Sequence, residues 1–247
     1  MPIQKKIQSR NGEIDILRFL FSIIIVFLHF SSSFSFDFCR NGGIGVEFFF
    51  LTSGYYMAKH ARKIVKEKQD ITNQTWKYII NKTRSFYRYY IVGIILNIII
   101  RYVLIQHKSI NQIFNLFLKS IPTFGLFFLG TNSNSIGLYV PNTWFLSAMM
   151  IACFILYPII LWRHDLSTKI LFPVVSIFLL GYMYVEKGTL FLTHDHWSGL
   201  INLGILRSIA EMALGASLLP LSEYIREKWP NNTGGGVFGS ALVYNGH

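Results

Sequence analysis

The chain has 247 residues, 52% of them hydrophobic and 14% charged, with a formal net charge of +11 at pH 7. Because a soluble domain contains about 25% charged residues, this composition excludes an ordinary soluble domain and indicates an integral membrane protein, surrounded by membrane lipids. The basic residues lie in short segments between apolar stretches, which is typical of cytoplasmic membrane loops and does not predict binding to nucleic acid.

Apolar segments long enough to cross a bilayer recur along the chain. A transmembrane helix needs about 20 such residues, and the predicted spans are 16–36, 42–58, 87–106, 142–162, 168–186 and 200–220. We therefore predict an all-α fold, a polytopic transmembrane helix bundle of about six spans within residues 1–228. An irregular, glycine-rich tail follows at 229–247.

The distribution of Lys and Arg predicts the orientation of this bundle. The segments before the first span and after the second are rich in basic residues and belong in the cytoplasm. We expect a multi-pass protein of the plasma membrane with a cytoplasmic N-terminus. The uncharged loop 131–143 then lies outside, so 113–130 cannot cross once and is predicted to form a re-entrant or interfacial hairpin. The alternative is an ordinary span with a different loop topology.

The first predicted span contains two residues that are costly inside a membrane, Arg18 and His29. Such residues indicate a functional site by default. They lie eleven positions apart, with ten residues between them, which places both on one face of a helix, about 16 Å apart. Asp15 lies one turn before Arg18 on that face, so a pair that anchors the helix at the cytoplasmic interface is the alternative role for Arg18.

The second predicted span contains one acidic residue, Glu47. Pairing residues symmetrically about a hairpin tip near residue 38 places Glu47 at about the depth of His29. A carboxylate beside an imidazole orients the ring and raises its basicity, so His29 and Glu47 are the predicted catalytic pair. The alternative is that Glu47 only neutralises a buried charge.

Two arginines, Arg84 and Arg88, lie one turn apart in the basic segment before the third span. Two guanidinium groups at this spacing suit a ligand with several phosphates, such as coenzyme A or a nucleotide. The alternatives are the usual basic flank of a membrane helix and a contact with anionic lipid.

The run His194-Asp195-His196 in a predicted outer loop has a metal-ligand composition. Alternating ligands without a third partner are weak evidence for metal, so no metal is predicted. Contact with a polysaccharide and a plain solvated loop remain as alternatives.

The sequence resembles the membrane acyltransferase 3 family in these same segments. In that family the first helix contains an Arg and a His separated by ten residues, here Arg18 and His29. The second contains a Gly-Val-acidic-Phe-Phe-Ser-Gly pattern, here Gly45, Val46, Glu47, Phe49, Phe50, Ser53 and Gly54. The following cytoplasmic segment has an Arg-x-x-Arg-like motif, similar to Arg84-Ser-Phe-Tyr-Arg88. Later similarities involve Trp144, Pro158, Arg207 and Gly215, so the resemblance covers about residues 12–220.

The resemblance implies an O-acyltransferase with acyl-CoA, usually acetyl-CoA, as cytoplasmic co-substrate. The acceptor would be a hydroxyl of a cell-surface or exopolysaccharide sugar. The phosphates of the donor would be held by Arg18, Arg84 and Arg88. His29, oriented by Glu47, would act as general base on the acceptor hydroxyl or hold the acyl group briefly itself. The sequence does not identify a protein partner.

Family members are longer and have more spans, so the resemblance also implies a C-terminal truncation. An incomplete bundle is expected to leave Arg207 and Glu211 exposed to lipid.

Two other functions are considered. One is a transporter or flippase of a polar or lipid-linked solute, in which Arg18, His29 and Glu47 form the pathway. The other is an inactive, truncated remnant.

Overall fold

The computed structural model describes residues 12–34, 43–65, 70–97, 99–100, 106–119, 144–193 and 195–228. Its helices are α1 (Gly12–Phe34), α2 (Ile44–Val65), α3 (Ile71–Asn97), α4 (Ile110–Lys119), α6 (Trp144–Trp162), α7 (His164–Leu166), α8 (Phe172–Lys187) and α9 (Leu203–Lys228). A π-helical turn, η2 (Ser167–Leu171), joins α7 to α8. The strands β1 (Trp197–Ser198) and β2 (Ile201–Asn202) form a short antiparallel pair. The described part of the chain is therefore almost entirely helical, as predicted. The tail 229–247 lies outside it.

Three helical segments of the described part are long and apolar enough to cross a membrane. They are Trp144–Trp162, His164–Lys187 and Leu203–Lys228, and they overlap the last three predicted spans. The all-α membrane fold is thus supported, whereas the predicted count of about six spans is not confirmed.

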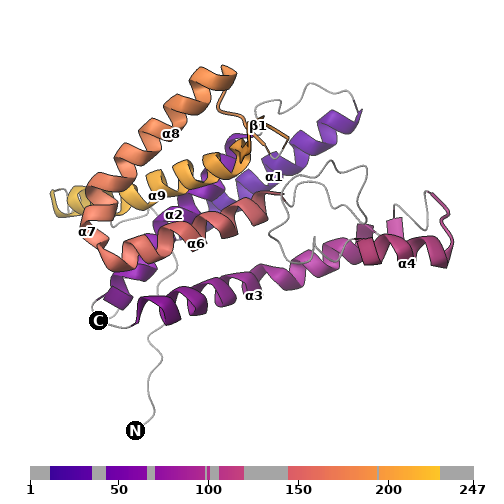
Figure 1. Cartoon of the computed structure of the whole chain (residues 1–247), viewed down its shortest axis with the longest axis horizontal. Helices are drawn as coiled ribbons and strands as arrows, with labels where there is room; N and C mark the ends of the chain where they lie inside the picture. The colour runs from indigo at the N-terminus through magenta and orange to yellow at the C-terminus, as the bar shows by residue number, and fades with distance from the viewer. Residues whose placement is uncertain are drawn as a thin grey trace, which may run out of the picture.

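Helices α2, α6 and α9 form the centre of the bundle, with α3 along one side and α8 along the other (Figure 1). The main apolar core consists of side chains from these three helices and from α3, together with Phe172 of α8. Phe50, Tyr157 and Met212 in this core have no exposed surface. A second, smaller core lies between α8, α9 and the segment after α8, around Met183 and Leu192.

Two glycines bring the backbones of α2 and α9 into contact. A Cβ atom at Gly54 would lie 1.9 Å from the Met212 carbonyl oxygen, and one at Gly215 would lie 2.0 Å from the Leu51 carbonyl oxygen. Small residues that let helix backbones approach this closely are typical of membrane helix pairs. This contact determines which side chains of α2 and α9 meet.

Pairs of contacts at both ends show that α2 and α9 run in the same direction. Glu47 pairs with Arg207 near the two N-terminal ends, and Arg62 pairs with Glu223 near the C-terminal ends. By the same reasoning α6 runs parallel to α2, because Met149 contacts Ser53 and Tyr157 contacts His60. The chain between α2 and α6 must therefore return to the side from which α2 starts.

Helix α3 begins at a capping aspartate and packs on α6. Asp70 accepts hydrogen bonds from the backbone N–H groups of Thr72 and Asn73, both at 3.2 Å, which is the usual role of an N-cap residue. The rings of Tyr78 and Tyr157 then stack with centroids 4.1 Å apart. Arg84 and Arg88 thus belong to a helix that starts well before the predicted span 87–106.

Helix α4 covers the start of the predicted hairpin at 113–130. It opens with a capping box, in which Ser109 and Gln112 exchange hydrogen bonds between side chain and backbone. Its ten residues are too few to span a bilayer, and its apolar residues Ile110, Phe114 and Phe117 are exposed. Residues 120–143 lie outside the described part, so the hairpin stays a prediction.

Candidate active site

Two contacts between α1 and α2 determine how the first hairpin is aligned. A Cβ atom at Gly45 would lie 2.8 Å from the Ile25 side chain. The rings of Phe21 and Phe48 stack with centroids 4.4 Å apart. Glu47, between Gly45 and Phe48, therefore lies at the level of Phe21 to Ile25 on α1.

His29 lies farther along α1 than the level of Glu47. It is four to eight residues beyond that level, which corresponds to about 6–12 Å along the helix axis. The equal depth predicted for the two residues is wrong, because packing at Gly45 sets the alignment and symmetry about the hairpin tip does not. The side chain of His29 lies outside the described part, so its contact with Glu47 stays a prediction.

Glu47 pairs with Arg207, a residue 160 positions later in the chain. Nη2 of Arg207 donates to Oε1 of Glu47 at 3.1 Å, and the side chains are 2% and 28% exposed, respectively. The α2–α9 backbone contact positions the two helices for this pair. An ionic contact this deep in a membrane bundle is typical of a functional site.

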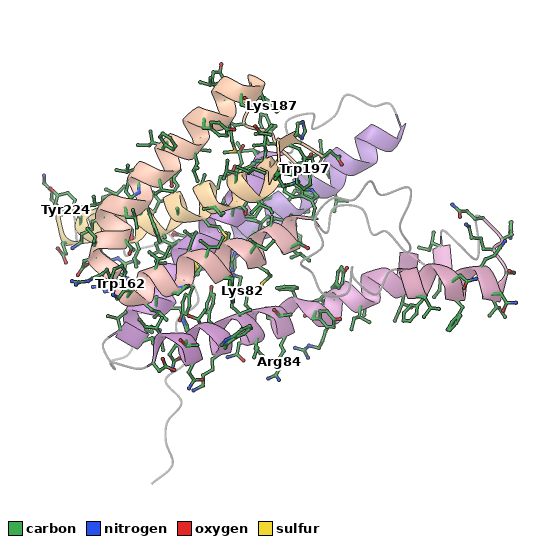
Figure 2. All side chains as sticks on the ribbon, in the orientation of Figure 1. Lys82, Arg84, Trp162, Lys187, Trp197 and Tyr224 are labelled. Carbon is green, nitrogen blue, oxygen red and sulfur yellow. The ribbon has the colours of Figure 1, made fainter. Side chains whose placement is uncertain are left out.

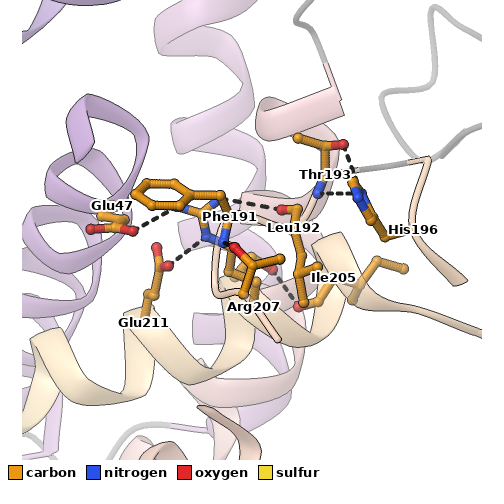
Figure 3. Close-up of polar contacts among 10 residues, drawn as sticks. Glu47, Phe191, Leu192, Thr193, His196, Ile205, Arg207 and Glu211 are labelled. Atoms are coloured by element: carbon orange, nitrogen blue, oxygen red, sulfur yellow. Dashed lines mark hydrogen bonds and ion pairs between the residues drawn. The ribbon is translucent and has the colours of Figure 1, made fainter. Parts of the chain in front are cut away.

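The Arg207 guanidinium donates to three groups at once (Figure 3). Besides Glu47, Nε donates to Oε1 of Glu211 at 2.6 Å, and Nη1 donates to the Leu192 carbonyl at 3.2 Å. The Phe191 ring lies 5.9 Å from the guanidinium carbon. Arg207, Glu47 and Glu211 together form what we call the buried charge cluster, with one cation and two carboxylates.

Local hydrogen bonds hold the loop that supplies Leu192 and Phe191. Gly199 takes φ +58° at the first position of the two-residue turn between β1 and β2, as in a type II′ hairpin. Asn202 then caps α9 by accepting from the Ile205 N–H at 3.2 Å. His196 accepts at Nδ1 from the Thr193 N–H, also at 3.2 Å. These bonds place the loop against the N-terminal end of α9.

The expectation that Arg207 and Glu211 are exposed to lipid is wrong. Arg207 is 2% exposed and Glu211 is 5% exposed. Packing of α9 against α2, α6 and α8 covers both residues. Their i,i+4 spacing on an apolar helix was the sequence signal that could have identified them as a site.

Arg18 lies on α1 with His29, as predicted, and contacts residues of α1 and α2. It pairs with Asp15 at 3.9 Å and stacks over the Tyr56 ring, whose centroid is 4.8 Å from the guanidinium carbon. The predicted Asp15–Arg18 pair is therefore present. Arg18 is thus held between α1 and α2, whereas Arg84 and Arg88 lie on α3.

Arg84 and Arg88 lie on one face of α3, as predicted. Together with Thr83 and Tyr87 they line a cavity of about 450 Å³. Both side chains are exposed, and Arg84 points away from the bundle (Figure 2). The guanidinium groups are thus available to a ligand at the surface of α3.

The run His194-Asp195-His196 is described only in part, because His194 lies outside the described residues. His196 is occupied in the loop by Thr193, and Asp195 is exposed. Within the described ranges, no three His, Cys, Asp or Glu side chains lie close enough together to hold a metal ion.

Comparison with known proteins identifies the family. No curated protein and no solved structure matches the chain. The model of the acyltransferase 3 family (Acyl_transf_3, acyltransferase domain) matches residues 11–244, which is nearly the whole chain. The match includes the first hairpin and also α9, with its buried charge cluster. The chain therefore belongs to the acyltransferase 3 family of membrane acyltransferases.

Proposed function

We propose that the chain is an integral-membrane O-acyltransferase. It transfers an acyl group, in particular acetyl, from cytoplasmic acyl-CoA to a hydroxyl of a cell-surface or exopolysaccharide sugar. The observation that supports this proposal is the family match over residues 11–244. The buried charge cluster beside α1 adds a chemical reason, because charges are retained in a membrane bundle mainly where they act.

The proposed transfer starts with the acceptor hydroxyl. His29 takes its proton as the hydroxyl oxygen attacks the acyl carbonyl carbon. The carbon–sulfur bond then breaks, and the CoA thiolate leaves with the proton that His29 returns. Glu47 orients the imidazole and stabilises its protonated form. Helical side chains tilt toward the helix N-terminus, so Glu47 leans toward the end of the hairpin where His29 lies.

The donor is proposed to bind on the outer face of α3. Arg84 and Arg88 present two exposed guanidinium groups on the wall of one cavity, a geometry that suits the phosphates of coenzyme A. Arg18 lies near the start of α1, where it contacts Tyr56 of α2. The pantetheine arm of the donor then extends along the bundle toward His29.

The test is acyl transfer in membranes from cells that express the chain. We expect label from radiolabelled acetyl-CoA to enter the polysaccharide fraction, and His29→Ala to abolish this incorporation. The rate should fall between pH 7.5 and pH 5.5, because the base must be neutral and histidine is the side chain that protonates in this range. His107→Asn, at an exposed histidine before α4, is the matched control and should keep the full rate.

Three results would contradict the proposal. Membranes with the wild-type chain that incorporate no label would remove the acyltransferase function and favour transport of a polar solute. Full incorporation by His29→Ala, or a rate that stays flat from pH 5 to pH 8, would remove His29 as the base.

A further inference from the structure

We propose that Arg207 and Glu211 are positioning residues of this acyltransferase: Glu211 holds the Arg207 guanidinium, and Arg207 holds the Glu47 carboxylate beside the helix that contains His29. The inference rests on the proposed function. It assigns a catalytic purpose to two residues of α9 that lie far from the first hairpin in sequence.

The first step is the contact within α9. Glu211 lies one turn after Arg207, and its Oε1 accepts from the guanidinium Nε at 2.6 Å. Both side chains are more than nine-tenths buried. A long arginine side chain has many rotamers in the open, so this short, buried contact selects the one that extends toward α2.

The second step is the contact between helices. Nε of Arg207 donates to Glu211 and Nη1 donates to the Leu192 carbonyl. The remaining nitrogen, Nη2, donates to Oε1 of Glu47. The guanidinium is planar and rigid, so fixing two of its nitrogens fixes the direction of the third. The position of the Glu47 carboxylate thus depends on α9 and on the loop before β1.

The third step is the enclosure of the cluster. Phe191 lies over the guanidinium and against the start of α2, where a Cβ atom at Gly43 would be 3.0 Å from its ring. The ring covers one side of the guanidinium, and Arg207 itself is 2% exposed. Burial of the guanidinium strengthens its ionic contacts, because the local dielectric is low.

The cluster is not arranged for stability alone. One guanidinium faces two carboxylates, and Oε2 of Glu211 is buried without a hydrogen-bond partner in the described part of the chain. A buried polar atom without a partner is destabilising and rare in native proteins. A cluster that only neutralised Glu47 would need no second carboxylate. The second carboxylate instead suits a role in which Glu211 holds the guanidinium toward Glu47.

The experiment measures kcat and KM for acetyl-CoA with radiolabelled acetyl-CoA and the membrane polysaccharide fraction, per amount of folded chain. We expect Glu211→Gln to lower kcat by about 10-fold to 100-fold, as loss of a supporting contact does, with little change in KM. Arg207→Lys should keep more of kcat than Arg207→Met, because the lysine retains the positive charge. The matched control is Glu223→Gln, which removes an exposed ion pair between the same two helices and should leave kcat unchanged.

A double variant separates positioning from simple structural support. If Glu211 acts through Glu47, then Glu211→Gln should lower kcat by less than about twofold in a Glu47→Gln chain. The same fold loss in both backgrounds would overturn the proposal, as would full kcat in Glu211→Gln. If Glu211→Gln yields no folded protein, Glu211→Asp and Arg207→Lys, which keep the charges, are measured instead. A lower kcat in both supports the proposal, and full kcat in both overturns it.

The outcomes for this inference and for the proposed function are distinct. No transfer by the wild-type chain overturns both. Transfer that requires His29 but is indifferent to Glu211 and Arg207 overturns only the present proposal.

Discussion

The two ion pairs between α2 and α9 differ in their surroundings. Arg62 and Glu223 are 44% and 40% exposed, whereas Arg207 is 2% exposed. Exposed pairs contribute about 0–1 kcal/mol, but removal of one partner from a buried pair costs about 3–5 kcal/mol. Loss of Arg207 should therefore destabilise the bundle more than loss of Arg62, and conservative changes are required to study it.

Arg84 and Arg88 allow a prediction about donor binding. Because both are exposed and line one cavity, replacing either by glutamine should leave the fold intact and remove a charge-assisted contact with a phosphate. Such a contact is worth about 1.5–3 kcal/mol, so we expect KM for acetyl-CoA to rise by about 10-fold or more, with kcat nearly unchanged. Initial rates at varied acetyl-CoA concentration measure this.

The control for this prediction is Arg163→Gln. Arg163 is an exposed arginine beside Trp162, at the C-terminal end of α6 and off the face of α3. An equal rise in KM in this variant would mean that general surface charge, and not a site on α3, attracts the donor.

At the scale of elements, the α2–α9 contact has the greatest influence on the site. The glycines Gly54 and Gly215 lie on facing sides of the contact, and each touches the backbone of the other helix. Glu47 and Arg207 lie about two turns from these glycines toward the N-terminal ends. A change in helix separation at the glycines therefore moves the two charged groups apart.

We predict that Gly54→Ala destabilises the bundle. The added methyl group would overlap the Met212 carbonyl, and forcing extra volume into a packed contact costs about 1–3 kcal/mol. Gly181→Ala, on α8, is the matched control, because a Cβ atom there meets nothing within 4 Å and alanine favours the helix by up to about 1 kcal/mol. Thermal unfolding in detergent measures both, and equal stability of the two variants would contradict the packing argument.

At the scale of the whole molecule, helix directions constrain the topology. Helices α2, α6 and α9 run in one direction. Helix α1 runs in the other direction, since Ile25 meets Gly45 while Arg18 meets Tyr56. Helix α8 does so too, since Ser176 meets Ala210 while Met183, later in α8, belongs to one core cluster with Leu203 at the start of α9. The topology predicted from the basic loops gives these helices the same directions. In that topology the segment between α3 and α6 starts and ends on the same side of the membrane.

The predicted orientation can be tested by labelling single cysteines in intact cells. In a chain with Cys39→Ser, a membrane-impermeant maleimide should label Leu200→Cys, at a position 98% exposed in the β1–β2 turn. It should label Thr72→Cys, at the start of α3, only after the cells are permeabilised. Cys153 is fully buried and should not react. The control is the Cys39→Ser chain without an added cysteine, which should not be labelled. The reverse pattern would invert the orientation.

Much of this protein follows from its sequence by local physics. Composition and apolar segment length determine the membrane class and the helical fold, because a backbone in lipid must satisfy its hydrogen bonds within each helix. The order of residues around Arg18, His29 and Glu47 indicated the acyltransferase 3 family, which the family match confirms. The pairing of Asp15 with Arg18, and the shared face of Arg84 and Arg88, follow from the helical repeat alone.

Only the tertiary structure decided what Glu47 contacts. Its partner Arg207 is 160 residues away, and no local rule relates the two. Their meeting depends on how closely α2 and α9 approach at Gly54 and Gly215. The burial of Arg207 and the offset between Glu47 and His29 were mispredicted for the same reason. Depth and exposure in a bundle are set by side-chain packing between helices, which spacing along one helix does not contain.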